Sequence, residues 1–229
     1  MAHFVLIPGA DGRGWYWHRV APLLEDLGNS TVSVDLPVSD PTAGIERYVA
    51  TVLEAIGGRR SDLVLVGQSL GGFIAPVAAA EVQADQIILL NAMIPIPGES
   101  AGAWWENTGQ GQARADHYAR EGLDLPAEFD PIEAFFHDFP PDVFQEAMAM
   151  GAQPARFDNL FSEPWPLAHW PDIPTRVLQA RDDRFFPLEF QHRVVSERLG
   201  IEIEEVPGGH LAALSHPKEV AEKLLAQPA

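Results

Sequence analysis

The chain has 229 residues, 46% of them hydrophobic and 21% charged, a composition typical of one globular domain with a sizeable buried core. Its formal net charge is −18, its only lysines are Lys218 and Lys223, and its lysines and arginines form no cluster that could bind a nucleic acid or an anionic membrane surface. It contains no cysteine, which excludes disulfides, thiolate metal sites and a cysteine nucleophile.

The N-terminal segment gives an expectation about location. Met1 to Pro8 has neither a basic region nor a small-residue cleavage site, so we expect no signal peptide. No stretch approaches the ~18 unbroken apolar residues of a membrane-spanning helix. The sequence therefore predicts a cytoplasmic protein that does not insert into a membrane.

Short runs of apolar, often β-branched residues alternate with helical patterns along the chain. Strands are expected at His3–Ile7, Thr31–Leu36, Asp62–Val66, Gln86–Asn91, Arg176–Ala180 and Ile201–Val206. Helices are expected at Trp17–Leu27, Ile45–Ile56, Leu70–Val82, Leu188–Leu199 and Pro217–Leu225. This alternation predicts an α/β fold with a mostly parallel six-stranded sheet flanked by helices.

One connection is much longer than the others. Roughly eighty residues separate Asn91 from Thr175, far more than an ordinary loop contains. Helical patterns occur within it at Gly111–Arg120 and Pro140–Met150. We interpret the segment of about 93–172 as a helical cap inserted into a single domain that spans 1–229.

Gly67-Gln68-Ser69-Leu70-Gly71 matches the pattern G-x-S-x-G between a predicted strand and a predicted helix. The turn that joins these elements is so sharp that the residues two before and two after the serine must lack side chains. Such a turn holds the serine in a strained conformation above the carboxyl edge of the sheet. The sequence therefore predicts Ser69 as a nucleophile, against the alternative of a glycine–serine loop without function.

A serine hydroxyl needs a base that removes its proton, and eight histidines are candidates. His210 follows the last predicted strand, and Gly208 and Gly209 allow a tight turn that returns the imidazole over the sheet edge. His216 precedes Pro217 at a helix start, where a capping or surface role is expected. The remaining histidines fall in the cap, on helices or at a strand start, namely His117, His137, His169, His3, His18 and His192. We therefore predict His210 as the base.

The acid that orients the base should follow a strand between the serine and the histidine. Asp182 and Asp183 both do so, and only one can reach the imidazole because successive residues point in different directions. The other is expected to pair with Arg181 or Arg184. Asn91 ends the preceding strand, but an amide cannot stabilise an imidazolium by charge.

An oxyanion hole needs two backbone N–H groups. One is expected from Leu70, directly after the nucleophile. The other is expected from Ala10, because the glycines of the loop from Pro8 to Gly14 let the backbone approach a ligand closely. This loop has neither a lysine nor the G-x-G-x-x-G spacing, so it does not indicate a nucleotide site.

Over nearly its full length the chain resembles the α/β-hydrolase superfamily, and within it the small methylesterases and hydroxynitrile lyases. The similar segments are Ile7-Pro8-Gly9-Ala10 with Gly14-Trp15-Tyr16-Trp17, the serine turn, Ala180-Arg181-Asp182-Asp183 ahead of Phe186-Pro187, and Gly208-Gly209-His210-Leu211. In that group the acid stands four residues before a proline, so the resemblance favours Asp183 over Asp182. It also implies that Ala10 donates an oxyanion N–H.

The chain departs from this group at two positions that matter for lyase chemistry. The lyases carry a lysine directly after the histidine and a threonine in the first loop, where this chain has Leu211 and Gly9. Both differences argue against lyase activity. Ser69 likewise argues against the haloalkane and epoxide chemistry of relatives that use an aspartate nucleophile.

The predicted cap is rich in aromatic residues, most of which we expect to pack within it. A few apolar side chains of a cap above the nucleophile must line the pocket, which implies a hydrophobic acyl or alcohol group on the substrate. We name Trp104 and Trp105 as the candidate substrate-binding residues.

The sequence thus predicts a serine hydrolase that cleaves a small, uncharged, hydrophobic carboxylic ester through an acyl-enzyme, with Ser69, His210 and Asp183 as the triad. No cofactor or metal is implied. The expected partner is the small-molecule ester, with neither nucleic acid nor membrane, and a homodimer stays open. Two alternatives also stay open: hydrolysis of a lactone or C–C bond on the same triad, and a non-catalytic small-ligand receptor of the same fold.

Overall fold

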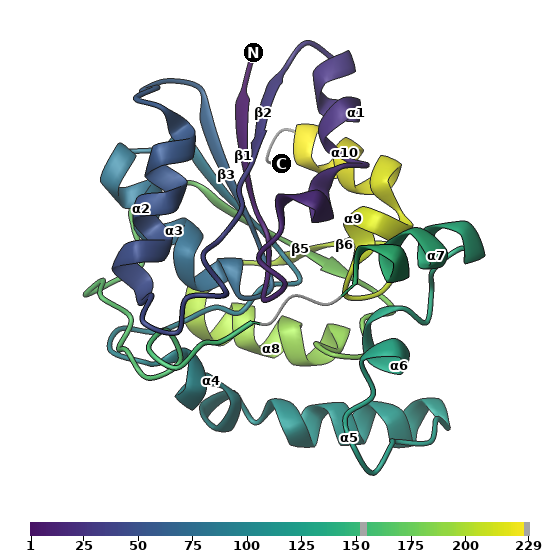
Figure 1. The fold of residues 1–229 in the computed structure, drawn as a ribbon. Coiled ribbons are helices and arrows are strands. Elements are labelled where there is room, and N and C mark those ends of the chain that lie inside the picture. The colour runs from purple at the N-terminus through teal and green to yellow at the C-terminus, as the bar shows by residue number, and fades with distance from the viewer. Residues whose placement is uncertain (152–154, 227–229) are drawn as a thin grey trace.

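The computed structural model describes residues 1–151 and 155–226. Its centre is a sheet of six parallel strands in the order β2-β1-β3-β4-β5-β6 (Figure 1). The strands are β1 (His3–Ile7), β2 (Ser30–Ser33), β3 (Leu63–Gln68), β4 (Gln86–Leu90), β5 (Thr175–Ala180) and β6 (Ile203–Val206). The predicted α/β class and parallel sheet are confirmed.

Helices cover both faces of this sheet (Figure 1). Three of them have the predicted bounds: α2 (Ile45–Ile56), α8 (Leu188–Leu199) and α10 (Pro217–Leu225). α3 (Gly71–Val82) begins one residue later than predicted, and a short α9 (Ala212–Ser215) was not foreseen. α2, α3 and α8 contribute to the hydrophobic core on one face, and α9 and α10 to the core on the other.

The strand β1 shows why the sheet needs both layers. Val5 and Ile7 belong to the core with α2, α3 and α8, whereas Phe4 and Leu6 belong to the core on the opposite face. Side chains alternate between the faces of a strand, so a strand buried along its whole length must be covered twice.

The predicted helix Trp17–Leu27 is wrong. The structure has a 3-10 helix, η1 (Gly14–Trp17), and a separate α1 (Ala21–Asp26). Pro22 lies in the first turn of α1, where its missing N–H is harmless. In a helix that began at Trp17, the same proline would remove a hydrogen bond and clash with the carbonyl of His18.

The described part of the long connection between β4 and β5 contains four helices. They are α4 (Ala101–Thr108), α5 (Gln110–Glu121), α6 (Pro131–Phe135) and α7 (Pro141–Met150). The expected helices Gly111–Arg120 and Pro140–Met150 correspond to α5 and α7, whereas α4 and α6 are too short to show a clear apolar period. Residues 152–154 of the predicted cap lie outside the described residues. Across residues 1–151 and 155–226, we find no helix long and apolar enough to cross a membrane.

Candidate active site

Ser69 lies in the sharp turn between β3 and α3, with a backbone φ of +50°. A Cβ atom on Gly67 would lie 2.7 Å from the carbonyl oxygen of Gly71, and one on Gly71 would lie 2.9 Å from that of Pro8. Neither distance is tolerable, so both positions require glycine. The left-handed φ of a serine marks backbone strain at this turn.

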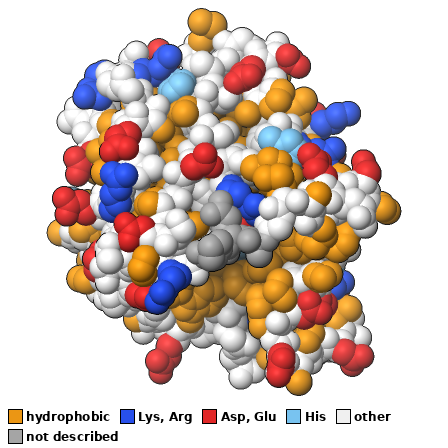
Figure 2. All heavy atoms as spheres, viewed as in Figure 1, with side chains coloured by type: hydrophobic (Ala, Val, Ile, Leu, Met, Phe, Trp, Pro, Cys, Tyr) orange, Lys and Arg blue, Asp and Glu red, His pale blue; other side chains and the backbone are white. Residues whose placement is uncertain are grey.

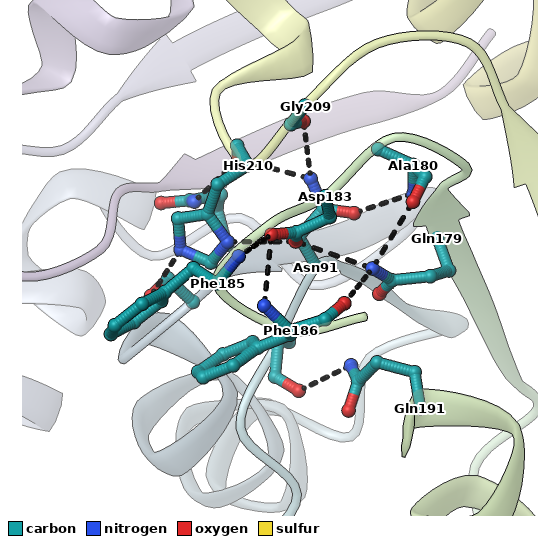
Figure 3. A network of polar contacts seen from close by, with 12 residues as sticks. Asn91, Gln179, Ala180, Asp183, Phe185, Phe186, Gln191, Gly209 and His210 are labelled. Atoms are coloured by element: carbon teal, nitrogen blue, oxygen red, sulfur yellow. Dashed lines mark hydrogen bonds and ion pairs between the residues drawn. The ribbon is translucent and has the colours of Figure 1, made fainter. Parts of the chain in front are cut away.

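Three side chains form one hydrogen-bonded chain. The Nε2 of His210 lies 3.0 Å from the Oγ of Ser69, and its Nδ1 lies 2.8 Å from the Oδ2 of Asp183. The other carboxylate oxygen accepts the N–H groups of Phe185 and Phe186 at 2.8 and 2.9 Å (Figure 3). All three side chains are buried. Because both carboxylate oxygens are held, Asp183 can fix the orientation of the imidazole.

The neighbouring Asp182 is exposed and does not meet the imidazole. Its carboxylate accepts the N–H of Gly208 at 3.4 Å, and its own N–H donates to the Gly208 carbonyl at 3.0 Å. The expected partnership of the second aspartate with an arginine is therefore wrong, since Arg184 pairs instead with Glu133 at 2.6 Å.

Two amide side chains, Asn91 and Gln179, form hydrogen bonds with the segments that carry the acid and the base (Figure 3). Asn91, fully buried at the end of β4, accepts the N–H of Ala180 and donates to the carbonyls of Gly209 and His210. Gln179 donates to the Oδ2 of Asp183 at 3.2 Å. Sequence reasoning rejected Asn91 as the acid, but no local pattern indicated that its side chain joins the two loops.

The loop after β1 brings backbone N–H groups to the same place. A Cβ on Gly9 would lie 2.8 Å from the Cβ of Ser69, so this loop passes directly against the nucleophile. Within the described part of the chain, the N–H groups of Ala10 and Leu70 have no hydrogen-bond acceptor. Neither N–H group is therefore used within the described fold.

A cavity of about 560 Å³ opens on Ser69 and His210. Its apolar side chains come from η1, from α6 and the residue after it, from α7 and from the segment after the base: Trp15, Tyr16, Ile132, Phe135, Phe136, Ala147, Met148, Leu211 and Leu214. The ring of Phe135 lies 5.3 Å from the imidazole of His210, centroid to centroid. Burial raises the pKa of the Tyr16 phenol, so this lining group stays neutral.

Apart from the base, the charged side chains among the described residues that line the cavity are those of Asp11 and Arg13, whose opposite charges offset each other. The guanidinium of Arg13 binds both carboxylate oxygens of Asp11 at 2.6 and 2.7 Å. It also donates to the carbonyls of Met150 and Gly151 at the end of α7. Among the described residues, we find no group of three or more side chains suited to hold a metal ion.

The two tryptophans named for substrate binding, Trp104 and Trp105, do not line this cavity as far as the described residues show. Trp104 is fully buried, and its ring packs 5.2 Å from that of Phe186 while its N–H donates to the carbonyl of Ile94. Trp105 packs against Phe185. Trp104 is thus a core residue and Trp105 packs, partly buried, against the core. Both positions follow from the path of α4, which the sequence did not reveal.

The comparisons with known proteins agree with this architecture. A family model described as Alpha/beta hydrolase family matches residues 4–223, so the chain belongs to this family. It is 24% identical to an Alpha-hydroxynitrile lyase of Arabidopsis thaliana over 98% of this chain and 96% of the relative. It is 27% identical to a Pyrethroid hydrolase of Sphingobium wenxiniae over 96% and 85% of the two chains. The crystal structure of polyneuridine aldehyde esterase shares the fold, with a TM-score of 0.76, 21% identity and 98% of both chains covered.

Proposed function

We propose that the protein is a serine hydrolase that cleaves an uncharged carboxylic ester with a hydrophobic acyl or alcohol group. The observation that carries this proposal is the unbroken hydrogen-bonded chain from Ser69 through His210 to Asp183 at the floor of an apolar cavity. Relatives and fold neighbours named as an esterase and as a pyrethroid hydrolase support the same class of reaction.

In this proposal His210 accepts the hydroxyl proton of Ser69 while the Oγ attacks the ester carbonyl carbon. The negative oxygen of the tetrahedral intermediate is held by the N–H groups of Ala10 and Leu70. Collapse breaks the C–O bond to the alcohol, which takes the proton from His210. A water molecule then attacks the carbonyl carbon of the acyl-enzyme while His210 accepts its proton. The bond to the Oγ of Ser69 breaks, Ser69 takes the proton from His210, and the carboxylic acid is released.

The cavity and the charge of the protein support an uncharged, hydrophobic substrate. The volume of about 560 Å³ falls in the range of sites that enclose drug-sized ligands, so the substrate can be larger than the small ester expected from the sequence. Acidic side chains are scattered over the face shown in Figure 2, while hydrophobic ones gather below its centre. With a net charge of −18, this surface disfavours the approach of an anionic substrate.

A fluorophosphonate probe tests the proposal. We expect one covalent adduct, located on Ser69 by peptide mass spectrometry, and none in the Ser69→Ala variant. The same variant should lose about 10³-fold or more in the hydrolysis of p-nitrophenyl esters. A panel of these esters with increasing acyl length then measures how much of the cavity the acyl group occupies. An adduct at another residue, or full activity in Ser69→Ala, would overturn the assignment.

A further inference from the structure

Asp138 lies between α6 and α7, and its carboxylate contacts the loop that carries His210. The Oδ2 of Asp138 accepts the N–H of Gly209 at 2.7 Å and the hydroxyl of Ser215 at 2.7 Å. Its side chain is only 12% exposed. Gly209 directly precedes His210, so a carboxylate from the long connection holds the main chain one residue away from the imidazole.

The two glycines before His210 make room for this carboxylate. A Cβ on Gly208 would lie 2.5 Å from the Nδ1 of His216 and 3.0 Å from the Oδ2 of Asp138. A Cβ on Gly209 would lie 2.8 Å from the Nε2 of His137 and 3.0 Å from the Oδ1 of Asp138, so the glycines make room for these two histidines as well as for the carboxylate. Gly208 also has a left-handed φ of +97°. The glycines therefore serve more than the tight turn expected from the sequence, because they let a side chain from another segment reach the main chain.

The loop is thus held by side chains from two separate segments. From the sheet, Asn91 donates to the carbonyls of Gly209 and His210. From the segment between α6 and α7, Asp138 accepts the N–H of Gly209. Small displacements of a reacting group reduce rates strongly, so two such contacts on one residue bear directly on where the imidazole lies.

We propose that Asp138 is a positioning residue for His210, acting through its hydrogen bonds to Gly209 and Ser215. The effect on turnover rests on the proposed hydrolase function, whereas the effect on the loop does not. The position of the His210 imidazole therefore depends on how the segment that contains α6 and α7 packs against the loop of His210.

Other contacts also hold this segment in place. The effect of Asp138 on the position of His210 can therefore be distinguished from a general role in anchoring α7. Arg13 donates to the carbonyls of Met150 and Gly151 at 3.0 and 2.8 Å, and His18 lies 3.0 Å from Glu146 of α7. The loss of the Asp138 carboxylate therefore leaves α7 attached to the region around η1.

Three variants test the proposal with a neutral p-nitrophenyl ester. In Asp138→Ala we expect kcat to fall about 10- to 100-fold with KM changed little, because the base is displaced and the cavity is not. Asp138→Asn keeps an oxygen that accepts both hydrogen bonds, so its kcat should stay within about threefold of the parent. The matched control is Asp142→Ala, which removes an exposed carboxylate from the first turn of α7.

Hydrogen–deuterium exchange of the peptide 207–211 gives a readout that needs no substrate. We expect faster exchange in Asp138→Ala than in the parent, Asp138→Asn or Asp142→Ala. If the parent protein neither labels with fluorophosphonate nor cleaves esters, the hydrolase proposal fails, and the exchange result still decides this one. The positioning proposal would be overturned if exchange and kcat were unchanged in a folded Asp138→Ala variant. It would also be overturned if Asp138→Asn or Asp142→Ala lost as much kcat as Asp138→Ala.

Discussion

The side-chain amide of Asn91 donates a hydrogen bond to the main-chain carbonyl of His210 at 3.0 Å, across 119 positions of sequence. Its oxygen accepts the N–H of Ala180 at 2.7 Å (Figure 3). One fully buried side chain thus joins the end of the strand before the acid to the loop of the base. Asn91 has a φ of +47°, a conformation that asparagine adopts more readily than most residues.

The variant Asn91→Asp keeps the size of the side chain and one acceptor oxygen but removes the donor. The carbonyls of Gly209 and His210 would then face a second oxygen, so the loop of the base should shift. We expect kcat for a neutral ester to fall about 10- to 100-fold. A second variant, Asn91→Ala, should lower the free energy of unfolding by about 1–3 kcal/mol, because it leaves buried polar groups without partners. Steady-state kinetics and urea unfolding measure the two effects, and parental kcat in folded Asn91→Asp would contradict the role.

The two adjacent aspartates should differ sharply in their effect on turnover. Asp183→Asn replaces the carboxylate that accepts from the imidazole, which leaves the wrong tautomer and should reduce kcat by about 10³- to 10⁴-fold. Asp182→Asn alters only an exposed contact to Gly208 and should be mild. Kinetics of the two purified variants on one ester make the comparison. The reverse order would show that Asp183 is not the acid, despite its position.

Lyase chemistry should be absent, even though one relative is named Alpha-hydroxynitrile lyase. Leu211, directly after the base, lines the cavity and offers no positive charge to released cyanide. Arg13 also lines it, but the Nε and Nη2 of its guanidinium donate to the carboxylate of Asp11 and its Nη1 donates to the carbonyl of Met150. We expect no cyanide release from mandelonitrile or acetone cyanohydrin above the uncatalysed rate at mildly acidic pH. Robust release would refute the argument and favour the lyase reaction for this site.

Local patterns were sufficient to predict most of the fold, together with Ser69 and His210, whereas the choice of Asp183 over Asp182 needed the family resemblance. The helix α2 was predicted with its observed bounds because its apolar period stops at Ile56, where Gly57 adopts the left-handed conformation that ends a helix. Ser69, Asp183 and His210 each follow a strand, and the carboxyl ends of parallel strands meet at one edge of the sheet. Topology therefore brought together residues that the sequence identifies one at a time.

The supporting contacts could not be predicted because they join segments far apart in the chain without any local pattern. Asp138 reaches Gly209 across 71 positions, and its turn between two short helices has no periodicity that would orient it. Trp104 is a similar case, because an aromatic residue in the long connection can equally line a cavity or pack into the core. Only the path of α4 decides that it packs against Phe186.

Acidification should destabilise the fold through His137, whose Nε2 is buried without a hydrogen-bond partner among the described residues. Burial, aided by Arg184, lowers the pKa of His137 below its ordinary value, although nearby carboxylates act in the opposite direction. The unfolded chain then binds more protons than the folded one, so the free energy of unfolding is highest above an ordinary imidazole pKa of about 6.5 and declines as the pH falls below it. Urea unfolding at pH 7.5 and 5.5 measures this slope. His137→Gln should reduce the slope, while the exposed control His192→Gln should leave it in place; an unchanged slope in His137→Gln would contradict the prediction.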